Sequence, residues 1–484
     1  MNRREFLKGT AWMLSAAQAA GCSSGGLALG TGAGGSMNGF SCAPMKRVRV
    51  GVIGLGTRGS EAARRLSTVP GVDVAAICDV RPERIAITQE KIKKNGKPPA
   101  REYSGEDGWK RLCDADGIDV AYIVTDWEHH APMGIYAMKN CKHAFLEVPA
   151  AVTVDQCWEL VETAEKCRVH CMMLENCNYG DTELLALNLC RSGVLGEITH
   201  ADCAYIHDLR SHCYQTGSGG YWNHWRLRFN QKHKGNAYPT HGLGPVCWYM
   251  NVNRGDRLDY LVSIESQQAS CEHYAREVYG NDTVAPWKKD VRLAMGDMNT
   301  TLVKTMLGRS IMIQHDVSTP RPYTRHNLVQ GTKGAFFGMP WRIKNVDQWR
   351  VAIDAPGCKG AHEWWSLDSE KGREIFEKYR HQMWRDAGEI AKLAGGHGGK
   401  DFIMDLRWAY CLQNGLPLDI DVYDTATWSC IVDLSEKSVR SGSSPQKIPD
   451  FTKGGWKTAT PVGDMRIDIA KLDIAGSSQG LVGR

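Results

Sequence analysis

No Cys-x-x-Cys pair occurs among the 17 cysteines of this 484-residue chain. Pairs at that spacing are typical of zinc sites and redox centres, so their absence argues against both. The cysteine number is odd, and many cysteines, such as Cys78 and Cys430, lie in apolar runs where they act as small hydrophobic residues. We therefore predict mostly free thiols, no disulfide framework and no metal site.

The chain also lacks internal repeats and any basic tract with interleaved aromatic residues, so a nucleic-acid partner is not expected. Its formal net charge is only +5, and a composition of 42% hydrophobic and 23% charged residues is that of an ordinary globular protein. Its length is enough for about two or three domains.

The N-terminus has the features of a targeting segment. "MNRREFLKGTAWMLSAAQAAGCSS" has a basic start, an apolar centre too short to span a bilayer, and small residues at its end. "RREFLK", Arg3–Lys8, resembles a twin-arginine export signal, with an ordinary secretion signal or a cytoplasmic tail as alternatives. "AAGC" resembles a lipoprotein cleavage site, although Ala19 stands where Leu is usual, so membrane attachment through Cys22 stays open. We expect residues 1–45 to be a signal and a flexible leader.

A nucleotide-binding pattern follows in "KRVRVGVIGLGTRGSEAARRL". A β-branched apolar run predicts a buried strand, and Gly54, Gly56 and Gly59 then form G-x-G-x-x-G before a helix-forming stretch. The first glycine permits a tight turn, the second lets the backbone approach a pyrophosphate, and the third lets the helix pack on the strand. The helix N-terminus adds free N–H groups for phosphate, so Thr57 and Arg58 are also expected at the cofactor.

The next apolar strand, "VDVAAICDV", contains Asp79, which lies 79 − 59 = 20 residues after Gly59. A carboxylate there accepts hydrogen bonds from the adenosine ribose and repels a 2′-phosphate, which predicts NAD rather than NADP. Arg81 is a counter-signal, and a glycine-rich turn in another α/β fold is the alternative. We predict a Rossmann NAD-binding domain over residues 46–172.

Two further strands are expected at Asp119–Thr125 and His143–Val148. Ligand loops in open parallel sheets lie at the carboxyl ends of strands, so the residues that follow should face the nicotinamide half of the cofactor. For His129 and His130, helix capping with solvent exposure is an equal alternative. The expected residues are Trp127, Glu128, His129, His130, Glu147, Val148 and, further on, Asn176.

Four features resemble the Gfo/Idh/MocA group, the glucose–fructose oxidoreductase and inositol dehydrogenase family. They are "VGVIGLGTRG", the "CDV" strand end, the HH-x-P loop with Pro132, and the E-x-P stretch Glu147–Pro149. The resemblance implies a second, α+β domain with an open, mostly antiparallel sheet, which we place at residues 173–450 before a C-terminal tail at 451–484.

A closer resemblance covers nearly the whole chain. "RREFLK", "LENCNYG", "AYIHDLR", "WRLR" and above all "AYPTHGLGPV", Ala237–Val246, are similar to the NAD-dependent glycosidases of glycoside hydrolase family 109. That resemblance implies NAD as cofactor and an α-N-acetylgalactosaminidase activity. The implied partner is a glycan or glycoprotein with terminal α-linked N-acetylgalactosamine.

One residue departs from the dehydrogenases of the wider group. They use a lysine between Glu and Pro, together with Asp and His in a D-x-G-x-H segment, whereas this chain has Val148, Thr240 and Gly244 at the corresponding places. A chain that keeps its cofactor loop but loses this relay is either a rewired enzyme or a binding protein. Replacement titratable groups are present, because tyrosine and histidine can serve as acids and bases.

The resemblance implies a cycle in which NAD⁺ oxidises the sugar at C3, a base removes the C2 hydrogen, the C1 group leaves, water adds, and the hydride returns. The result is hydrolysis with retention and no net redox, unlike the two-carboxylate route. On this scheme Tyr179 is the expected base at C2, His241 and Tyr238 act at the C3 hydroxyl, and Glu147 assists the leaving group or the water. The implied sugar contacts are Tyr205, Arg226, Tyr238, Pro239, Thr240, His241 and Tyr323.

Some of these assignments have simpler alternatives. Thr240 could cap a helix, and Tyr323 lies in "RPYTR", which is also consistent with an exposed loop. His397, within "GGHGGKD", is a candidate turn residue near the site with an open role. At the level of function, an NAD-dependent sugar oxidoreductase and a non-catalytic binding protein remain alternatives, as does a homo-oligomer.

The second domain gives three clear local predictions. Asn299–Val317 predicts two strands around Leu307–Arg309, and Asp401–Gly415 predicts an amphipathic helix that ends at its glycine. "VYDTATWSCIVDLSEKSVRSG" predicts another helix with Gly442 as its stop signal. We expect these C-terminal helices to pack back on the first domain.

Overall fold

The computed structural model describes residues 35–215, 217–343, 346–354 and 362–468, and all of them belong to the unit Ala33–Arg484. The predicted export signal, with Cys22, lies outside the described residues. None of the helices in the described ranges combines the length and hydropathy of a membrane span.

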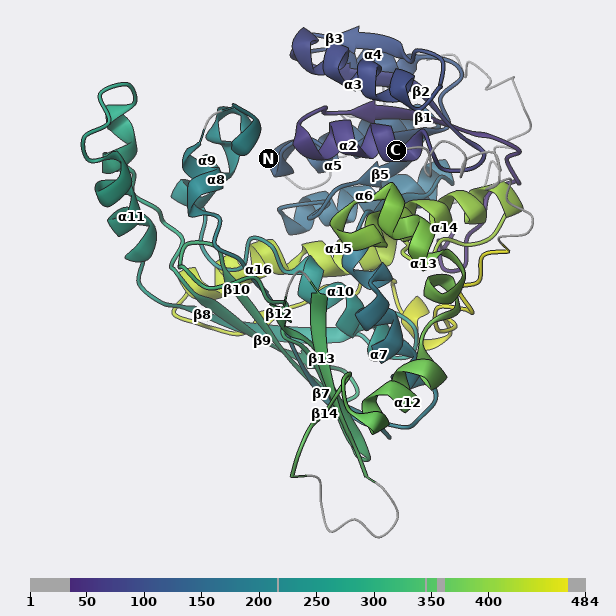
Figure 1. The fold of residues 1–484 in the computed structure, drawn as a ribbon, viewed down its shortest axis with the longest axis vertical. Coiled ribbons are helices and arrows are strands. Elements are labelled where there is room, and N and C mark those ends of the chain that lie inside the picture. Colours follow the sequence, from purple (N-terminus) through teal and green to yellow (C-terminus); the bar gives the residue numbers. More distant parts are fainter. Residues whose placement is uncertain (1–34, 216, 344–345, 355–361, 469–484) are drawn as a thin grey trace, which may run out of the picture. The chain divides into compact units, whose positions relative to one another are not determined.

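The first sheet has six parallel strands in the order β3-β2-β1-β4-β5-β6. This order, with helices between successive strands, is that of a dinucleotide-binding Rossmann domain, and it places the ligand edge where β1 and β4 lie side by side. The prediction of a Rossmann domain is confirmed (Figure 1). The elements are β1 (Val48–Ile53), α2 (Thr57–Leu66), β2 (Val72–Asp79), α3 (Pro82–Lys94), β3 (Arg101–Ser104), α4 (Gly108–Asp114), β4 (Val120–Ile123), α5 (Trp127–Lys139), β5 (His143–Leu146), α6 (Val154–Cys167) and β6 (Cys171–Met173).

The second sheet has nine strands in the order β14-β13-β12-β11-β7-β10-β9-β8-β15 and is open (Figure 1). Of its neighbouring strands only β7 and β10 run parallel, so the sheet is mostly antiparallel, as expected. The predicted strand pair around Leu307–Arg309 is present as β9 and β10. The strands are β7 (Ile198–Ile206), β8 (Leu258–Glu265), β9 (Asn299–Thr305), β10 (Ser310–Asp316), β11 (Asn327–Gly331), β12 (Gly334–Ile343), β13 (Val346–Ile353), β14 (Trp365–Ser366) and β15 (Gln446–Lys447).

Helices and single 3-10 turns connect the strands of the second sheet. The helices are α7 (Asp181–Arg191), α8 (Arg210–Tyr214), α9 (Trp225–Lys232), α10 (Thr240–Tyr249), α11 (Ser270–Tyr279), α12 (Glu370–Tyr379) and α13 (Gln382–Ala394). The 3-10 turns are η1 (Asn176–Tyr179), η2 (Gly217–Gly219), η3 (Trp222–His224), η4 (Pro286–Asp290), η5 (His397–Gly399) and η6 (Gly455–Lys457).

Three C-terminal helices join the two sheets: α14 (Lys400–Asn414), α15 (Val422–Ser429) and α16 (Ile431–Arg440). α14 packs on β1 and α2, and α15 packs on α6 and β6, so these two helices return to the first domain as expected (Figure 1). α16 packs on β8 of the second sheet. The predicted last helix is divided at Cys430 into α15 and α16.

α14 corrects one prediction, because it is buried on nearly all sides rather than amphipathic. Its charged residues are paired inside the protein: Asp405 accepts from Arg65 Nε at 2.6 Å, and Arg407 Nε donates to Asp419 at 2.9 Å. Pairing is what allows charged residues to be buried. The charged residues of this helix therefore form ion pairs inside the protein and do not mark a solvent-exposed face.

The predicted flexible leader is also corrected, since residues 35–45 pack on the core. The backbone N–H of Met37 donates to the Tyr423 hydroxyl at 2.9 Å, and the N–H of Met45 donates to the carbonyl of Leu412 at 3.0 Å. Met37 is only 3% exposed. In the tail, Met465 is likewise buried. Small residues permitted a flexible leader, but the apolar side chains among them find partners that lie hundreds of residues away in the sequence.

Candidate functional site

The turn between β1 and α2 fits a dinucleotide phosphate. Gly54 has φ +86°, and a Cβ there would lie 2.5 Å from the carbonyl oxygen of Val124. A Cβ on Gly59 would lie 1.8 Å from the carbonyl of Gly54, so the helix can approach the strand only without a side chain. A Cβ on Gly56 would meet nothing within 4 Å, which leaves this side of the turn open. Gly56 begins α2 without a side-chain cap, so N–H groups of the first turn remain for an anion.

Asp79 ends β2 and braces this turn. Its carboxylate accepts hydrogen bonds from the backbone N–H of Leu55 at 2.7 Å and of Arg81 at 2.9 Å. A carboxylate has further acceptor positions, so the expected ribose contact is compatible with these two bonds. The Arg81 side chain donates to Asp79 at 3.3 Å, and its guanidinium carbon lies 4.0 Å from the ring centroid of Trp222. Arg81 is therefore engaged by groups of the protein, which weakens it as a signal for NADP.

Arg58 links the glycine turn to the second domain. Its Nε donates to Glu147 at 2.6 Å, and its Nη1 donates to Asp401 at 2.5 Å and lies 3.1 Å from His397 Nδ1. Asn176 Nδ2 donates to the same Asp401 carboxylate. The structure thus brings four predicted or candidate residues together around Asp401, which the sequence analysis did not single out.

Asp401 should matter for stability, because its carboxylate is 1% exposed and lies 3.6 Å from Arg65 as well as beside Arg58. Burial raises the pKa of Asp401, but Arg58, His397 and Arg65 outweigh burial and hold the pKa well below the usual 3.8. We expect Asp401→Asn to lower the free energy of unfolding at neutral pH by about 3–5 kcal/mol, because it leaves buried arginines uncompensated. Urea unfolding of both proteins measures the difference.

The pH dependence of that difference has a definite sign. A carboxyl group with a depressed pKa stabilises the fold above its unfolded value and loses this contribution as the pH falls through the folded value. The gap between the two proteins should therefore be full at neutral pH and shrink below about pH 4. Glu389→Gln is the control, because that side chain is 85% exposed and its pair with Lys392 contributes little. A gap no larger than that of the control would contradict this assignment.

The loop after β4 does not match the predicted cofactor contacts in every residue. Trp127 is 3% exposed and packs against rings of the second domain. The ring of His130 lies between the carbonyl oxygens of Pro149 at 2.8 Å and Thr125 at 3.1 Å, so its nitrogens hold two loops together. His129 is exposed and bonds to Asp126 at 2.6 Å. The alternative of solvent exposure fits His129 but not His130, which is 1% exposed. Glu128 is exposed.

An aromatic cluster lies beside Trp127 and contains most of the predicted sugar contacts. The ring centroid of Tyr238 is 5.6 Å from Trp127, 4.5 Å from Tyr205 and 4.9 Å from His241. Tyr323 joins it at 5.8 Å from Tyr205, so its segment is not merely an exposed loop. Burial raises the pKa of both Tyr205 and Tyr238, so their hydroxyls stay protonated and can donate hydrogen bonds.

Arg226, on α9, enters the same cluster. Its guanidinium carbon is 4.8 Å from the ring centroid of Trp127, 5.0 Å from Tyr238 and 5.8 Å from Tyr205. Nη1 donates to the Tyr221 hydroxyl at 3.1 Å, whereas Nε and Nη2 are buried without a hydrogen-bond partner among the described residues. A permanently charged group with free donors inside aromatic walls is suited to bind an oxygen-rich ligand.

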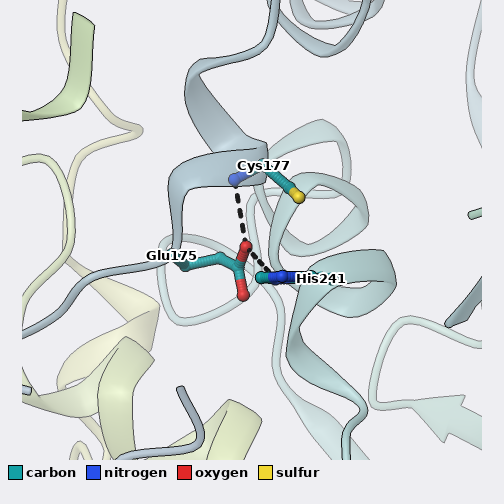
Figure 2. A group of neighbouring side chains, drawn as sticks. All are labelled: Glu175, Cys177 and His241. Carbon is teal, nitrogen blue, oxygen red and sulfur yellow. Dashed lines mark hydrogen bonds and ion pairs between the residues drawn. The ribbon is translucent and has the colours of Figure 1, made fainter. Parts of the chain in front are cut away.

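His241 is held by a carboxylate that the sequence analysis missed. Its Nδ1 lies 2.7 Å from Oε1 of Glu175, and the same oxygen accepts the backbone N–H of Cys177 at 3.0 Å (Figure 2). Burial alone would lower the pKa of His241, but Cys177 and Glu175 raise it well above its usual value. Ligand atoms of these three residues lie within 4.8 Å of one another, so the group is of a kind that can hold a metal ion. No such group was predicted.

Tyr179 is not brought to this cluster. It is fully buried, its hydroxyl lies 3.4 Å from Asp419, and its ring packs on Trp248. Burial and the Asp419 carboxylate raise the pKa of Tyr179 well above its usual value, which makes it a poor proton acceptor. Of the same motif, "LENCNYG", Asn176 contacts Asp401 and Glu175 contacts His241, but the tyrosine points into the core.

Thr240, which was predicted, and His207, which was not, have surroundings that the sequence analysis did not give. Thr240 is the first residue of α10 and fully buried, and Pro239 holds the cap position, so the alternative of a threonine cap is wrong. His207 was not predicted, yet its Nδ1 lies 3.2 Å from the Tyr205 hydroxyl and its ring 4.8 Å from that of Tyr323. His207 follows β7 and lies in "AYIHDLR", so that motif was the signal that could have pointed to it.

Sequence comparisons agree with the two-domain division. A family model described as "Glycosyl hydrolase 109, C-terminal domain" matches residues 179–458, and one described as "Oxidoreductase family, NAD-binding Rossmann fold" matches residues 48–175. The chain is 46% identical over 420 residues to a protein of Bacteroides fragilis named alpha-N-acetylgalactosaminidase, which covers 87% of this chain and 95% of that protein. It is 43% identical over 472 residues to "Glycosyl hydrolase family 109 protein 1" of Shewanella sp. strain ANA-3, with 96% and 98% covered.

Solved structures of similar fold support the same architecture at low sequence identity. An oxidoreductase domain protein from Kribbella flavida matches with a TM-score of 0.62 at 15% identity, covering 84% of this chain and 100% of that one. Levoglucosan dehydrogenase in complex with NADH and levoglucosan matches with a TM-score of 0.60 at 16% identity, covering 83% and 100%.

The two family matches, the identity along most of the chain and the geometry of the glycine turn agree. The first domain binds NAD, and the second carries the cluster of tyrosine, histidine and arginine residues. The chain is a glycoside hydrolase and belongs to glycosyl hydrolase family 109.

Proposed function

We propose that this protein hydrolyses terminal α-linked N-acetylgalactosamine from glycans or glycoproteins, with retention at C1 and no net redox change. The observation that carries the proposal is the contact between Trp127, at the ligand edge of the Rossmann sheet, and Tyr238 in the cluster of titratable groups. This contact supports the proposal, because Tyr238 and the titratable groups around it lie beside a residue of the Rossmann sheet's ligand edge, although the lysine of the related dehydrogenases is replaced by Val148.

Bound NAD supplies reversible oxidation at C3 of the sugar by accepting a hydride and later returning it. His241 takes the proton of the C3 hydroxyl in the first half and gives it back in the second. Tyr238, whose hydroxyl lies 3.4 Å from His241 Nε2, stands beside the same oxygen. Arg226 donates its free N–H groups to the acetamido carbonyl and the neighbouring hydroxyls, and the rings of Tyr205 and Tyr323 line the sugar faces.

Between these half-reactions a proton leaves C2, the C1–oxygen bond breaks, and the glycan departs with a proton. Water then adds at C1 on the same face, and C2 regains a proton, so atoms and electrons balance. We propose that a group other than Tyr179 accepts the C2 proton, because the Tyr179 hydroxyl is buried against Asp419. Glu147 accepts a hydrogen bond from Arg58 of the glycine turn. We assign to Glu147 the role of assisting the leaving group or the water.

The sugar oxidoreductase is the second candidate, because the fold is shared with dehydrogenases. A substitution at Val148, which is 3% exposed, distinguishes the oxidoreductase from the glycosidase. We expect Val148→Lys to give no steady accumulation of NADH with N-acetylgalactosamine and excess NAD⁺, because Thr240 and Gly244 supply neither of the lysine's usual partners. NADH absorbance measures this. Continuous NADH formation would mean that only the lysine was missing and would favour the oxidoreductase.

Export by the twin-arginine signal, which we infer from the sequence alone, is consistent with this proposal. Free NAD is not replenished outside the cytoplasm, so an exported enzyme needs a cofactor that is regenerated in each cycle and stays bound.

The direct experiment uses p-nitrophenyl α-N-acetylgalactosaminide and purified protein without added NAD. Release of nitrophenol without net NADH supports the glycosidase. Net NADH with an intact glycoside would support the oxidoreductase, and binding without turnover would support a non-catalytic protein. The last two results would each overturn the proposal.

A further inference from the structure

Glu175 has a position that its local role does not explain. It ends the segment after β6, and its side chain caps the short η1 turn by accepting the N–H of Cys177. A neutral Asn or Ser could do the same. Instead a carboxylate is fully buried there, and its Oε2 has no hydrogen-bond partner among the described residues. Burying a charge is costly unless it is paired, so this carboxylate requires a reason beyond the cap.

The pairing partner is His241. Oε1 of Glu175 lies 2.7 Å from Nδ1, which is the distance of a strong charge-assisted hydrogen bond. A carboxylate cannot donate, so the Nδ1 position must carry the hydrogen. The other ring nitrogen, Nε2, then faces the Tyr238 hydroxyl at 3.4 Å. The side chain of His241 is 13% exposed, whereas that of Glu175 is fully buried.

The alternative orientation of the imidazole would be unproductive. With the hydrogen on Nε2 and a lone pair on Nδ1, two acceptors would face each other at Glu175 and the outer nitrogen could not take a proton. A buried carboxylate behind a histidine therefore selects one tautomer and one ring orientation. Figure 2 shows the Glu175 carboxylate between the backbone of Cys177 and the ring of His241, so both bonds fix the same oxygen.

We propose that Glu175 is the positioning residue of the reaction: it holds His241 so that Nε2, beside Tyr238, exchanges the proton of the sugar C3 hydroxyl. This inference rests on the proposed function, because it assigns Glu175 through the role of His241 there. Glu175 itself touches neither sugar nor cofactor. The neighbouring Cys177 contributes its backbone N–H to the arrangement.

The test compares Glu175→Gln and Glu175→Asp with the unmodified protein. We expect Glu175→Gln to lower kcat on the order of 10²-fold, because an amide can donate to Nδ1 and stabilise the unproductive tautomer. KM and the amount of bound NAD should change little, since the cluster and the glycine turn are intact. Glu175→Asp keeps an acceptor and should recover a substantial part of the lost kcat. Glu165→Gln is the matched control: it is also a buried carboxylate, bonded to Tyr423 at 2.7 Å, remote from the site.

A second readout does not depend on turnover. The proton between Nδ1 of His241 and Glu175 should give a far-downfield NMR resonance, which disappears in Glu175→Gln and persists in Glu175→Asp. Unchanged kcat in Glu175→Gln, or absence of this resonance in the unmodified protein, would overturn the inference. So would loss of activity with chelator and recovery with a divalent metal, because Glu175 would then be a ligand. Failure of the unmodified protein to cleave the glycoside would overturn the proposed function instead, while the resonance would still report the pairing.

Discussion

Replacement of His241 by alanine is expected to lower kcat for α-N-acetylgalactosaminide hydrolysis by about 10²–10⁴-fold, the range of a lost general acid–base group. His241 is the group of the aromatic cluster that is backed by a buried carboxylate, at 2.7 Å from Glu175. Steady-state kinetics with the nitrophenyl glycoside measure the loss. The variant should retain bound NAD, because the hydrogen-bond partners of His241, Glu175 and Tyr238, lie outside the glycine turn.

The comparison for that variant is His273→Ala, which removes a histidine that is 65% exposed on α11. It should have unchanged kinetics. Since the pKa of His241 lies above its usual value, the activity of the unmodified protein should rise with pH from neutrality as more rings become able to accept a proton. An alanine variant with near-normal kcat would remove His241 from the mechanism.

Arg226→Met should separate binding from stability. The substitution removes a buried guanidinium with two unsatisfied nitrogens, so the folded protein loses a costly charge and should unfold at the same temperature or higher. The same change removes charge-assisted hydrogen bonds to the sugar, each worth about 1.5–3 kcal/mol, so KM should rise at least about 10-fold. Thermal unfolding and steady-state kinetics on the same preparation provide both values.

Arg228→Met is the matched control for this variant. It lies on the same helix, α9, but is exposed and donates to Asn223 at 2.6 Å. It should alter neither KM nor stability appreciably. If Arg226→Met strongly destabilised the fold, the role of the arginine would be to stabilise the cluster and not to bind the sugar.

The cofactor half of the site could be predicted from sequence because its signal is local. Gly54, Gly56 and Gly59 lie within six residues of one another. A Cβ on Gly54 or Gly59 would collide with the backbone, whereas Gly56 leaves one side of the turn open. The Rossmann domain predicted from this pattern is confirmed, and the structure adds the order of its strands. The carboxylate at Asp79 follows at the expected spacing after the third glycine.

The proton-handling half could be predicted only in part, because its contacts join distant segments. His241 and Tyr238 were found through one motif, whereas Glu175 is 66 residues away from its partner and Asp401 is 343 residues away from Arg58. Burial also decides a tyrosine's role: Tyr179 has the right chemistry, but the fold turns its hydroxyl to Asp419. Sequence patterns indicate which side chains are present and do not determine which way a single ring points.

The most direct test of the oxidation–elimination cycle is the isotope content of the released sugar. Hydrolysis of the nitrophenyl glycoside in deuterated water, without added NAD, should give N-acetylgalactosamine with deuterium at C2, retained configuration at C1 and no net NADH. A product without deuterium at C2 would show that no proton leaves that carbon. This result would contradict the cycle on which the roles of His241 and Glu175 depend.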